Sequence, residues 1–464
     1  MRIFLLFCFS AALCLAQDAR PSHHPTRERT YHVHHYKLNL TFDEKNKTCK
    51  GEVAITLSPL RSELDTLRLD AAEMNIQKVT LRGKPLEYRT EAETLVIVLD
   101  HRYAYGESLS VSVAYDVSSP KRGLYFVKPD SGYPNKHWQV WSQGEADDNH
   151  FWFPCYDYPN DFSTSEMYAT VNEKFTAIGN GKLMDVKDNP KQHAKTFHWL
   201  ESKPHVSYLI SIIAGEYIDV TQKSGALTIH NYVYKNQKGL AMNSFSKTPR
   251  MMDFYSKKIG YPYPWEKFAQ TVVQDFIYGG EENVSAVTLT DVTMHDARAH
   301  LDNSSDGLVA HELAHQWWGD LVTCRDWSQA WLNEGFATFF ENQFLEFDKG
   351  KDESQKEMHD TQNSLSITDV GDHRRATVSN YYFRPIELFD GHIYGKGACV
   401  LAMLKDYLGE ELFWKSINHY VHKHAFDNVE TNDFKIAIEE VTGQNLEWFF
   451  VRPKLRVGNV LVFR

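Results

Sequence analysis

Two histidines, a glutamate between them and a second glutamate further along have the spacing that best fits catalytic chemistry. His311 and His315 stand four residues apart, Glu312 follows the first, and Glu334 comes after eighteen intervening residues. On a helix, positions four apart lie on one face, so both imidazoles leave the helix in the same direction. Their nitrogens fit two corners of a tetrahedral zinc site, at about 2.0–2.1 Å from the ion.

Glu312 and Glu334 extend this pair into a complete site. Glu312 lies one step round the helix from His311, where a carboxylate can take a proton from a water bound to the metal. Glu334 falls on a second helical pattern, 328–347, which would present it as a third, oxygen ligand. A histidine pair at this spacing alone is more often a chance feature of a packed helix. With both acids in place, the sequence predicts a zinc site, and we expect one Zn²⁺ per chain.

The helices that must position these residues have sequence signals of their own. Ser304, Ser305 and Asp306 are candidate N-caps for the first helix, and Gly319 is a stop signal. The second helix contains Gly335, and an interior glycine costs a helix about 1 kcal/mol relative to alanine. We therefore expect another element to approach the second helix closely at Gly335.

Length, composition and charge limit the class of protein. At 464 residues, two or three domains are expected. The composition, 42% hydrophobic and 24% charged, is that of a globular protein with a large core. A formal charge of -11 and a pI near 6.1 argue against nucleic acid as a partner.

The first sixteen residues have the pattern of a secretory signal peptide. Arg2 gives a positive start, an apolar run covers 3–15, and Ala16 offers a small residue for cleavage before Gln17. The apolar run is too short to span a bilayer, and no later run reaches the ~18 apolar residues of a membrane helix. We expect a secreted or periplasmic protein with no transmembrane segment after cleavage.

The spacing of the cysteines favours free thiols over a metal site. Export permits disulfides, but the four cysteines that remain after cleavage of the signal peptide are scattered and form no CxxC pair, so we do not expect a zinc–cysteine site. Free buried thiols are the expected state of Cys49, Cys155, Cys324 and Cys399.

The strand and helix patterns divide the chain into two large regions. Residues 17–216 are predominantly strand-like, as in the alternation of apolar and polar residues over 36–42, and predict a β-sandwich or saddle. Residues 217–450 begin with strands and then become mainly helical, which predicts a catalytic domain of the α+β class. Residues 451–464 return to strand-like alternation. The fold class expected is therefore an α+β multidomain protein.

Several segments, taken together, resemble one enzyme family. HELAHQWWG and WLNEGFATFFE around the candidate site, and four further segments in the expected order, resemble the gluzincin aminopeptidases of the aminopeptidase N (membrane alanyl aminopeptidase) family. The resemblance covers about 30–450 and implies a saddle-like β domain, a thermolysin-like catalytic domain, and peptide substrates with a free N-terminus. The four further segments are FPCYDYPND at 153–161, YLISIIAGEY at 208–217, GYPYPWEKF at 260–268 and IYGKGACVL at 393–401.

The same resemblance assigns substrate-binding residues. It gives Glu282 the role of the acid that holds the free α-ammonium of the substrate, which fixes the peptide bond that meets the metal. Gln143 and Glu145 match β-domain residues that also hold the N-terminus. Glu281 stands where the family has methionine, and adds negative charge beside that site. The residues that match the family's Gly-x-Met-Glu-Asn signature are Gly279, Gly280, Glu281, Glu282 and Asn283.

Two more residues complete the predicted site. Tyr394 matches the family tyrosine whose hydroxyl stabilises the tetrahedral oxyanion. Glu341 lies seven residues after Glu334, about two helical turns along, and is placed to orient a ligand histidine. Asn283 also begins a formal glycosylation sequon, and a glycan on an active-site residue would be incompatible with function.

These residues predict a zinc aminopeptidase, and three alternatives stay open. A thermolysin-type endopeptidase shares the zinc chemistry, a non-catalytic relative would act as a binding module, and an epoxide hydrolase activity occurs in one branch of the family. Longer family members continue into a helical C-terminal domain, whereas this sequence stops at Arg464. We expect either a naturally short, more open enzyme that accepts larger peptides or a truncated product.

Overall fold

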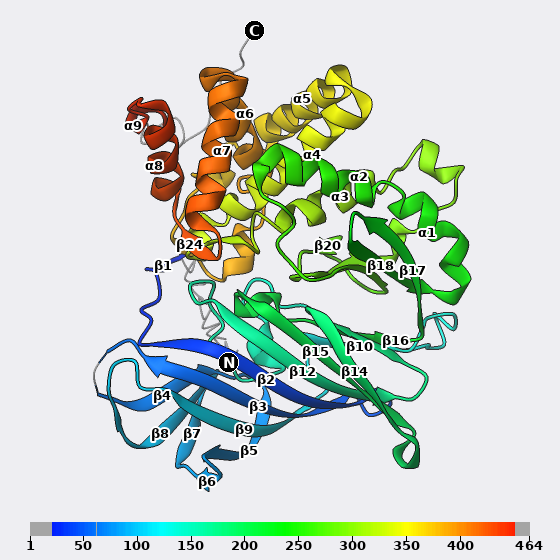
Figure 1. Ribbon diagram of the computed structural model, residues 1–464, viewed down its shortest axis with the longest axis vertical. Coiled ribbons are helices and arrows are strands. Elements are labelled where there is room, and N and C mark those ends of the chain that lie inside the picture. The colour runs from blue at the N-terminus through cyan, green and yellow to red at the C-terminus, as the bar shows by residue number, and fades with distance from the viewer. Residues whose placement is uncertain (1–20, 62, 451–464) are drawn as a thin grey trace, which may run out of the picture.

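The computed structural model of the protein describes residues 21–61 and 63–450. A β-rich N-terminal part is stacked beneath a C-terminal part that contains a smaller sheet and most of the helices (Figure 1). The predicted α+β class is confirmed. The predicted signal peptide, 1–16, and the strand-like tail, 451–464, lie outside the described residues.

An eight-stranded sheet forms the base of the N-terminal part. Along β2, Tyr36, Leu38 and Leu40 are buried, whereas Lys37 and Asn39 between them are more exposed. This alternation is that of a strand with one face on a core. The strands, in sheet order, are β14 (Lys182–Asn189), β15 (Ala194–His205), β12 (Ser163–Asn172), β2 (Tyr31–Asp43), β3 (Thr48–Pro59), β9 (Leu109–Ser118), β5 (Met74–Leu81) and β6 (Lys84–Pro85).

A second, three-stranded sheet shares the core of the first. Leu67 and Leu69 of one sheet lie in the same buried cluster as Leu38 and Val53 of the other. The two sheets therefore pack face to face, as the predicted sandwich requires. The strands of the second sheet are β4 (Leu64–Asp70), β8 (Thr94–Tyr103) and β7 (Tyr88–Glu91).

A four-stranded sheet lies between the N-terminal and C-terminal cores. Val140 packs in the N-terminal core and its neighbour Trp141 packs in the C-terminal core. Because both faces are covered, every residue of β11 and β16 is buried. Within the segment YLISIIAGEY, strand β16 begins only at Ile212, since Ser207–Leu209 is a 3-10 turn. The strands are β10 (Leu124–Val127), β11 (Gln139–Ser142), β16 (Ile212–Gly215) and β13 (Thr176–Gly179).

A mixed five-stranded sheet opens the C-terminal part. Its β18, β19 and β21 run parallel, and the two outer strands pair antiparallel. Strand β20 is an edge of only two residues, held to β21 by the pairs Gly280 with Leu289 and Glu281 with Thr288. The strands are β17 (Tyr217–Ser224), β18 (Leu227–Tyr234), β19 (Phe268–Val273), β21 (Ala286–Thr290) and β20 (Gly280–Glu281).

Helices cover this sheet and form the upper part of Figure 1. Helix α4 packs between α3 and α6. The close approach expected at Gly335 is present, because a Cβ there would lie 2.8 Å from the Cα of Gly397 in α6. The helices are α1 (Lys238–Phe245), α2 (Thr248–Tyr255), α3 (Asp306–His315), α4 (Trp331–Lys349), α5 (Lys351–Thr368), α6 (Gly395–Leu408), α7 (Glu410–His424), α8 (Thr431–Thr442) and α9 (Glu447–Phe450).

Two small pairings connect distant segments. Strand β1 (Ser22–His23) pairs with β23 (Tyr381–Tyr382), and β22 (Val322–Cys324) pairs with β24 (Asp427–Val429). Over the described ranges, none of the helices combines the length and the apolar character needed to cross a bilayer. The predicted thiol state is confirmed, because Cys49, Cys155, Cys324 and Cys399 are free and buried.

Candidate active site

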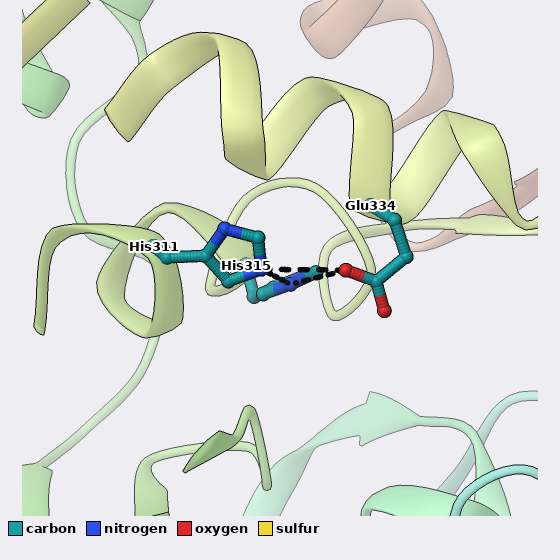
Figure 2. Close-up of side chains that lie close together, drawn as sticks. All are labelled: His311, His315 and Glu334. Atoms are coloured by element: carbon teal, nitrogen blue, oxygen red, sulfur yellow. Dashed lines mark hydrogen bonds and ion pairs between the residues drawn. The ribbon is translucent and has the colours of Figure 1, made fainter. Parts of the chain in front are cut away.

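The two histidines and the glutamate predicted to bind metal come together from two neighbouring helices. His311 and His315 lie one turn apart on α3, and Glu334 lies in the first turn of α4, which packs against α3. Figure 2 shows both imidazoles pointing toward the Glu334 carboxylate. The helical spacing read from the sequence thus produces one converging group of donor atoms.

The distances between these donor atoms fit a single small cation. His311 Nε2 and His315 Nε2 are 3.0 Å apart, and Glu334 Oε2 lies 3.3 Å from the first and 3.2 Å from the second. Tetrahedral ligands at about 2.0–2.1 Å from zinc are separated from one another by about 3.3 Å. Two nitrogens and one carboxylate oxygen also match the donor set of a catalytic zinc site, which keeps its fourth position open.

The outward-facing nitrogen of each imidazole has a partner that orients the ring. His315 Nδ1 donates to the Trp318 carbonyl oxygen at 2.8 Å. His311 Nδ1 faces Glu341 Oε2 at 3.4 Å, on the second turn of α4 beyond Glu334. With the proton held at Nδ1, the lone pair of each Nε2 faces the cation position. Glu341 therefore lies where the sequence spacing placed it.

The charge around the donor group favours a cation. Burial opposes ionisation of Glu334, but His315 and His311 outweigh it and lower the pKa of this carboxyl to about 2. Burial likewise opposes protonation of His315, but Glu282 and Glu334 raise its pKa to about 9. Carboxylates thus surround the imidazoles, and this negative environment is the one that a divalent metal ion neutralises.

Glu312 is buried beside the donor group without joining it. It projects from α3 toward Gly280 of β20, where the absence of a side chain leaves room for its carboxylate. Burial, together with Glu282 and Glu334, raises the pKa of Glu312 to about 8 against the opposing effect of the two histidines. A carboxyl with a pKa near neutrality can both accept and return a proton, as a general base requires.

The residues assigned to the substrate ammonium lie together beside the donor group. Glu145 follows β11 from the N-terminal part, and Glu281 and Glu282 come from β20 and the turn after it. These three carboxylates approach within 4.8 Å of one another. Gln143 donates its amide N–H to Glu281 Oε2. Local sequence patterns could not show this meeting, because 135 residues separate Gln143 from Gly279 and the neighbouring strands β11 and β20 belong to different sheets; only the family resemblance assigned both segments to the substrate N-terminus.

A cavity of about 440 Å³ connects these groups. The metal-binding residues line it together with Glu145, Glu282 and Glu312. Tyr394, at the start of α6, lines the same cavity, and its ring centroid is 6.1 Å from that of His311. The predicted base, ammonium-binding acids and oxyanion donor therefore face one space that a peptide N-terminus can enter.

Comparisons with known families agree with this arrangement. Residues 32–209 match the Peptidase M1 N-terminal domain, and residues 243–452 match the Peptidase family M1 domain. The chain belongs to the M1 peptidase family. The aminopeptidase N resemblance predicted from the motifs is thereby confirmed, and the M1 catalytic domain includes both α3 and α4.

Curated relatives carry aminopeptidase names but are longer. Aminopeptidase M1-C of Oryza sativa subsp. japonica is 29% identical over 88% of this chain and 48% of its own length. Tricorn protease-interacting factor F2 of Thermoplasma acidophilum is 27% identical, over 92% and 54%. Leucyl aminopeptidase of Saccharolobus solfataricus is 27% identical, over 89% and 52%. The chain spans about half the length of these curated relatives.

Solved structures of similar length share the fold. An M1 zinc metallopeptidase mutant from Deinococcus radiodurans, bound to a Tyr-Ser-Ala substrate, has a TM-score of 0.77 at 22% identity, covering 93% of this chain and 95% of that one. A second structure of an M1 zinc metallopeptidase from this organism gives 0.73 at 23%, covering 91% and 92%. The two-part M1 architecture therefore occurs in chains of about this length.

Two side chains of this M1 peptidase site have roles that the sequence did not reveal. The Tyr208 hydroxyl donates to Glu282 Oε1 at 3.0 Å and accepts from Asn333 Nδ2 at 3.3 Å. Gln316 Nε2 donates to the Glu282 backbone carbonyl at 2.9 Å. Tyr208 begins an apolar run that reads as core, and Gln316 stands between His315 and Trp317 in HELAHQWWG. For both residues, the available signal in the sequence was a polar side chain among residues expected to be buried.

One local expectation in this M1 site, the cap of α3, needs correction, and one, the absence of a glycan on Asn283, agrees with the structure. Ser305 is the N-cap residue of α3 by position, yet its hydroxyl donates to the Ser244 carbonyl and caps nothing. Asn283 is a formal glycosylation site, but its side chain is fully buried and donates to Thr288 Oγ1. A glycan therefore has no room on the folded chain, and Asn283 helps to hold the turn after β20.

Proposed function

We propose that this chain is a zinc-dependent aminopeptidase that binds one Zn²⁺ and hydrolyses the N-terminal residue from peptides. The observation that carries the proposal is one cavity lined by the metal-binding group and by the ammonium-binding acids. A group that binds a free amine beside a hydrolytic centre limits cleavage to the first peptide bond. An endopeptidase would have no use for Glu282 and Glu145 in that position.

Different residues of the chain bind the metal and transfer the proton. A zinc ion held by His311, His315 and Glu334 supplies a Lewis acid that acidifies water and polarises a carbonyl oxygen. Glu312 takes the proton from the attacking water and returns it to the leaving amine nitrogen.

Two other groups hold the substrate during this transfer. The Tyr394 hydroxyl donates to the carbonyl oxygen as that oxygen gains negative charge. Glu282 and Glu145 accept hydrogen bonds from the α-ammonium, and Gln143 supports them. Such charge-assisted hydrogen bonds fix the scissile carbonyl relative to Glu312.

The test is a panel of aminoacyl chromogenic substrates, each offered with a free and with an acetylated N-terminus, before and after chelation. We expect hydrolysis only of the free-amine substrates, loss of activity with chelator, and recovery with Zn²⁺. The Glu282→Ala variant is expected to lose mainly its affinity for free-amine substrates. Equal rates on acetylated and free substrates in the parent would contradict the proposal and support an endopeptidase.

We further propose that residues 1–16 are a cleaved secretory signal, that the mature protein is secreted or periplasmic, and that the domain boundary falls between 216 and 217. The charged start, apolar run and Ala16 support the first proposal. N-terminal sequencing of the exported protein is expected to give Gln17, and a retained Met1 would contradict it.

A further inference from the structure

Glu281 introduces a buried carboxylate at a position where the family signature has methionine. Its side chain is 2% exposed, and one of its oxygens, Oε2, accepts from the Gln143 amide. The other oxygen, Oε1, has no hydrogen-bond partner. A buried carboxylate with a free oxygen is costly unless a positive charge compensates it.

Two further buried carboxylates share this small volume. Oxygens of Glu145, Glu281 and Glu282 lie within 4.8 Å of one another. Within the described ranges, no lysine or arginine forms an ion pair with any of the three. Burial first, and then the neighbouring Glu282, raise the pKa of both Glu145 and Glu281. The three acids therefore oppose one another's ionisation, and a divalent cation among them would favour the ionised form of more than one carboxyl.

Buried oxygen atoms without hydrogen-bond partners surround this space. Gln143 is 1% exposed, and its Oε1 has no partner although the same amide group contacts Glu281. Glu145 Oε1 is likewise buried and without a partner. Three side chains from the N-terminal and C-terminal parts, Gln143, Glu145 and Glu281, therefore each present a buried oxygen without a hydrogen-bond partner. Carboxylate and amide oxygens are the ligands that Ca²⁺ takes in proteins.

The donor atoms of this group are all oxygens, whereas two of the three zinc donors are imidazole nitrogens. Ca²⁺ binds oxygens at about 2.3–2.6 Å, so ligands on opposite sides of the ion are up to about 5 Å apart. One oxygen from each of the three carboxylates lies within 4.8 Å of the other two, which is inside that limit. The zinc donors are 3.0–3.3 Å apart and suit a smaller tetrahedral ion. Glu145 and Glu282 also line the open cavity, which gives an ion a path to the site.

We infer that Glu145, Glu281, Glu282 and the amide oxygen of Gln143 form a second cation site, which binds one hard divalent cation of the Ca²⁺ class. Binding itself depends only on these four side chains. Its consequence rests on the proposed aminopeptidase function: the cation occupies carboxylates that the substrate ammonium needs, so the two compete. Ca²⁺ then acts as a competitive inhibitor of the zinc-loaded enzyme.

The direct test measures Ca²⁺ bound to zinc-loaded protein by equilibrium dialysis in 0.15 M salt, with both metals counted by elemental analysis. We expect one Ca²⁺ per parent chain in addition to zinc. Glu281→Gln, which keeps shape, and Glu281→Met, which gives the family residue, are expected to bind Ca²⁺ at least tenfold more weakly with zinc unchanged. Glu357→Gln removes an exposed carboxylate on α5 and is expected to bind like the parent.

Either of two results would overturn the inference: no Ca²⁺ bound to the parent at millimolar concentration, or equal binding by the parent and Glu281→Gln. Retained zinc and an unchanged unfolding midpoint establish that each variant is folded. Kinetics separate this inference from the proposed function. If Ca²⁺ binds and no peptide is hydrolysed, the proposed aminopeptidase function is refuted and the second cation site is supported. If hydrolysis occurs and the KM does not rise with Ca²⁺, the competition is refuted.

Discussion

Replacing Tyr208 by phenylalanine tests how the ammonium-binding acid is held. The Tyr208 hydroxyl is buried and donates to Glu282 Oε1 at 3.0 Å, while its ring packs edge-on against Trp327. Tyr208→Phe keeps this packing and removes only the donor. A hydrogen bond to a charged group contributes about 1.5–3 kcal/mol. At about 1.4 kcal/mol per factor of ten, the affinity for a free N-terminus should fall about tenfold to hundredfold.

The assay for Tyr208→Phe is the KM and kcat of aminoacyl substrates, with zinc measured on the same samples. We expect KM to rise by the stated factor, kcat to change little, and zinc to remain. Tyr420→Phe is the matched control, because the Tyr420 hydroxyl is also buried in the C-terminal core but has no hydrogen-bond partner. A KM within twofold of the parent for Tyr208→Phe, or a similar change in both variants, would refute the reasoning.

Three other variants probe different parts of the account. Glu312→Gln should keep zinc and lose about 10²–10⁴-fold in kcat, since it removes a general base; near-full turnover would exclude that role. Glu341→Gln should weaken zinc binding about 10–100-fold, because Glu341 faces the Nδ1 of His311. Competition with a chelator measures this affinity, and an unchanged value would show that Glu341 does not orient the ring. Burial lowers the pKa of His205 to about 3 from 6.5. The unfolded state therefore binds more protons between these pH values, and stability falls as the pH drops below 6.5, by up to about 1.4 kcal/mol per pH unit. Urea unfolding at pH 7 and 5 should show this dependence, and His205→Asn should reduce it; equal pH slopes in both proteins would contradict it.

The helical part of the site could be predicted because its geometry is local. The spacing of four residues from His311 to His315 corresponds to about one helical turn whatever surrounds the helix, and Glu341 follows Glu334 by the same rule. Gly335 also indicated a close helix contact, and the Cα of Gly397 supplies it. The relative positions of residues on one helix follow from the helical period alone.

The ammonium pocket depends on contacts that no local pattern encodes. Tyr208 and Glu282 are 74 residues apart, and Tyr208 stands in an apolar run that reads as a core strand. Strand β20 has two residues, too few to show alternation, so its pairing with β21 could not be foreseen. Motif resemblance assigned Glu282, Gln143 and Glu145 to the substrate N-terminus, but only the fold shows that Glu145 lies beside Glu282 and that Glu281 has an unpartnered oxygen.

The most direct test of the central claim is the zinc content of purified parent, His315→Ala and Glu334→Ala proteins, measured by elemental analysis after dialysis. The donor atoms of His311, His315 and Glu334 lie 3.0–3.3 Å apart, so each is expected to bind the same ion. We expect one zinc per parent chain and a loss of most of it in both variants while they remain folded. A parent without zinc, or folded variants that retain it in full, would contradict the account.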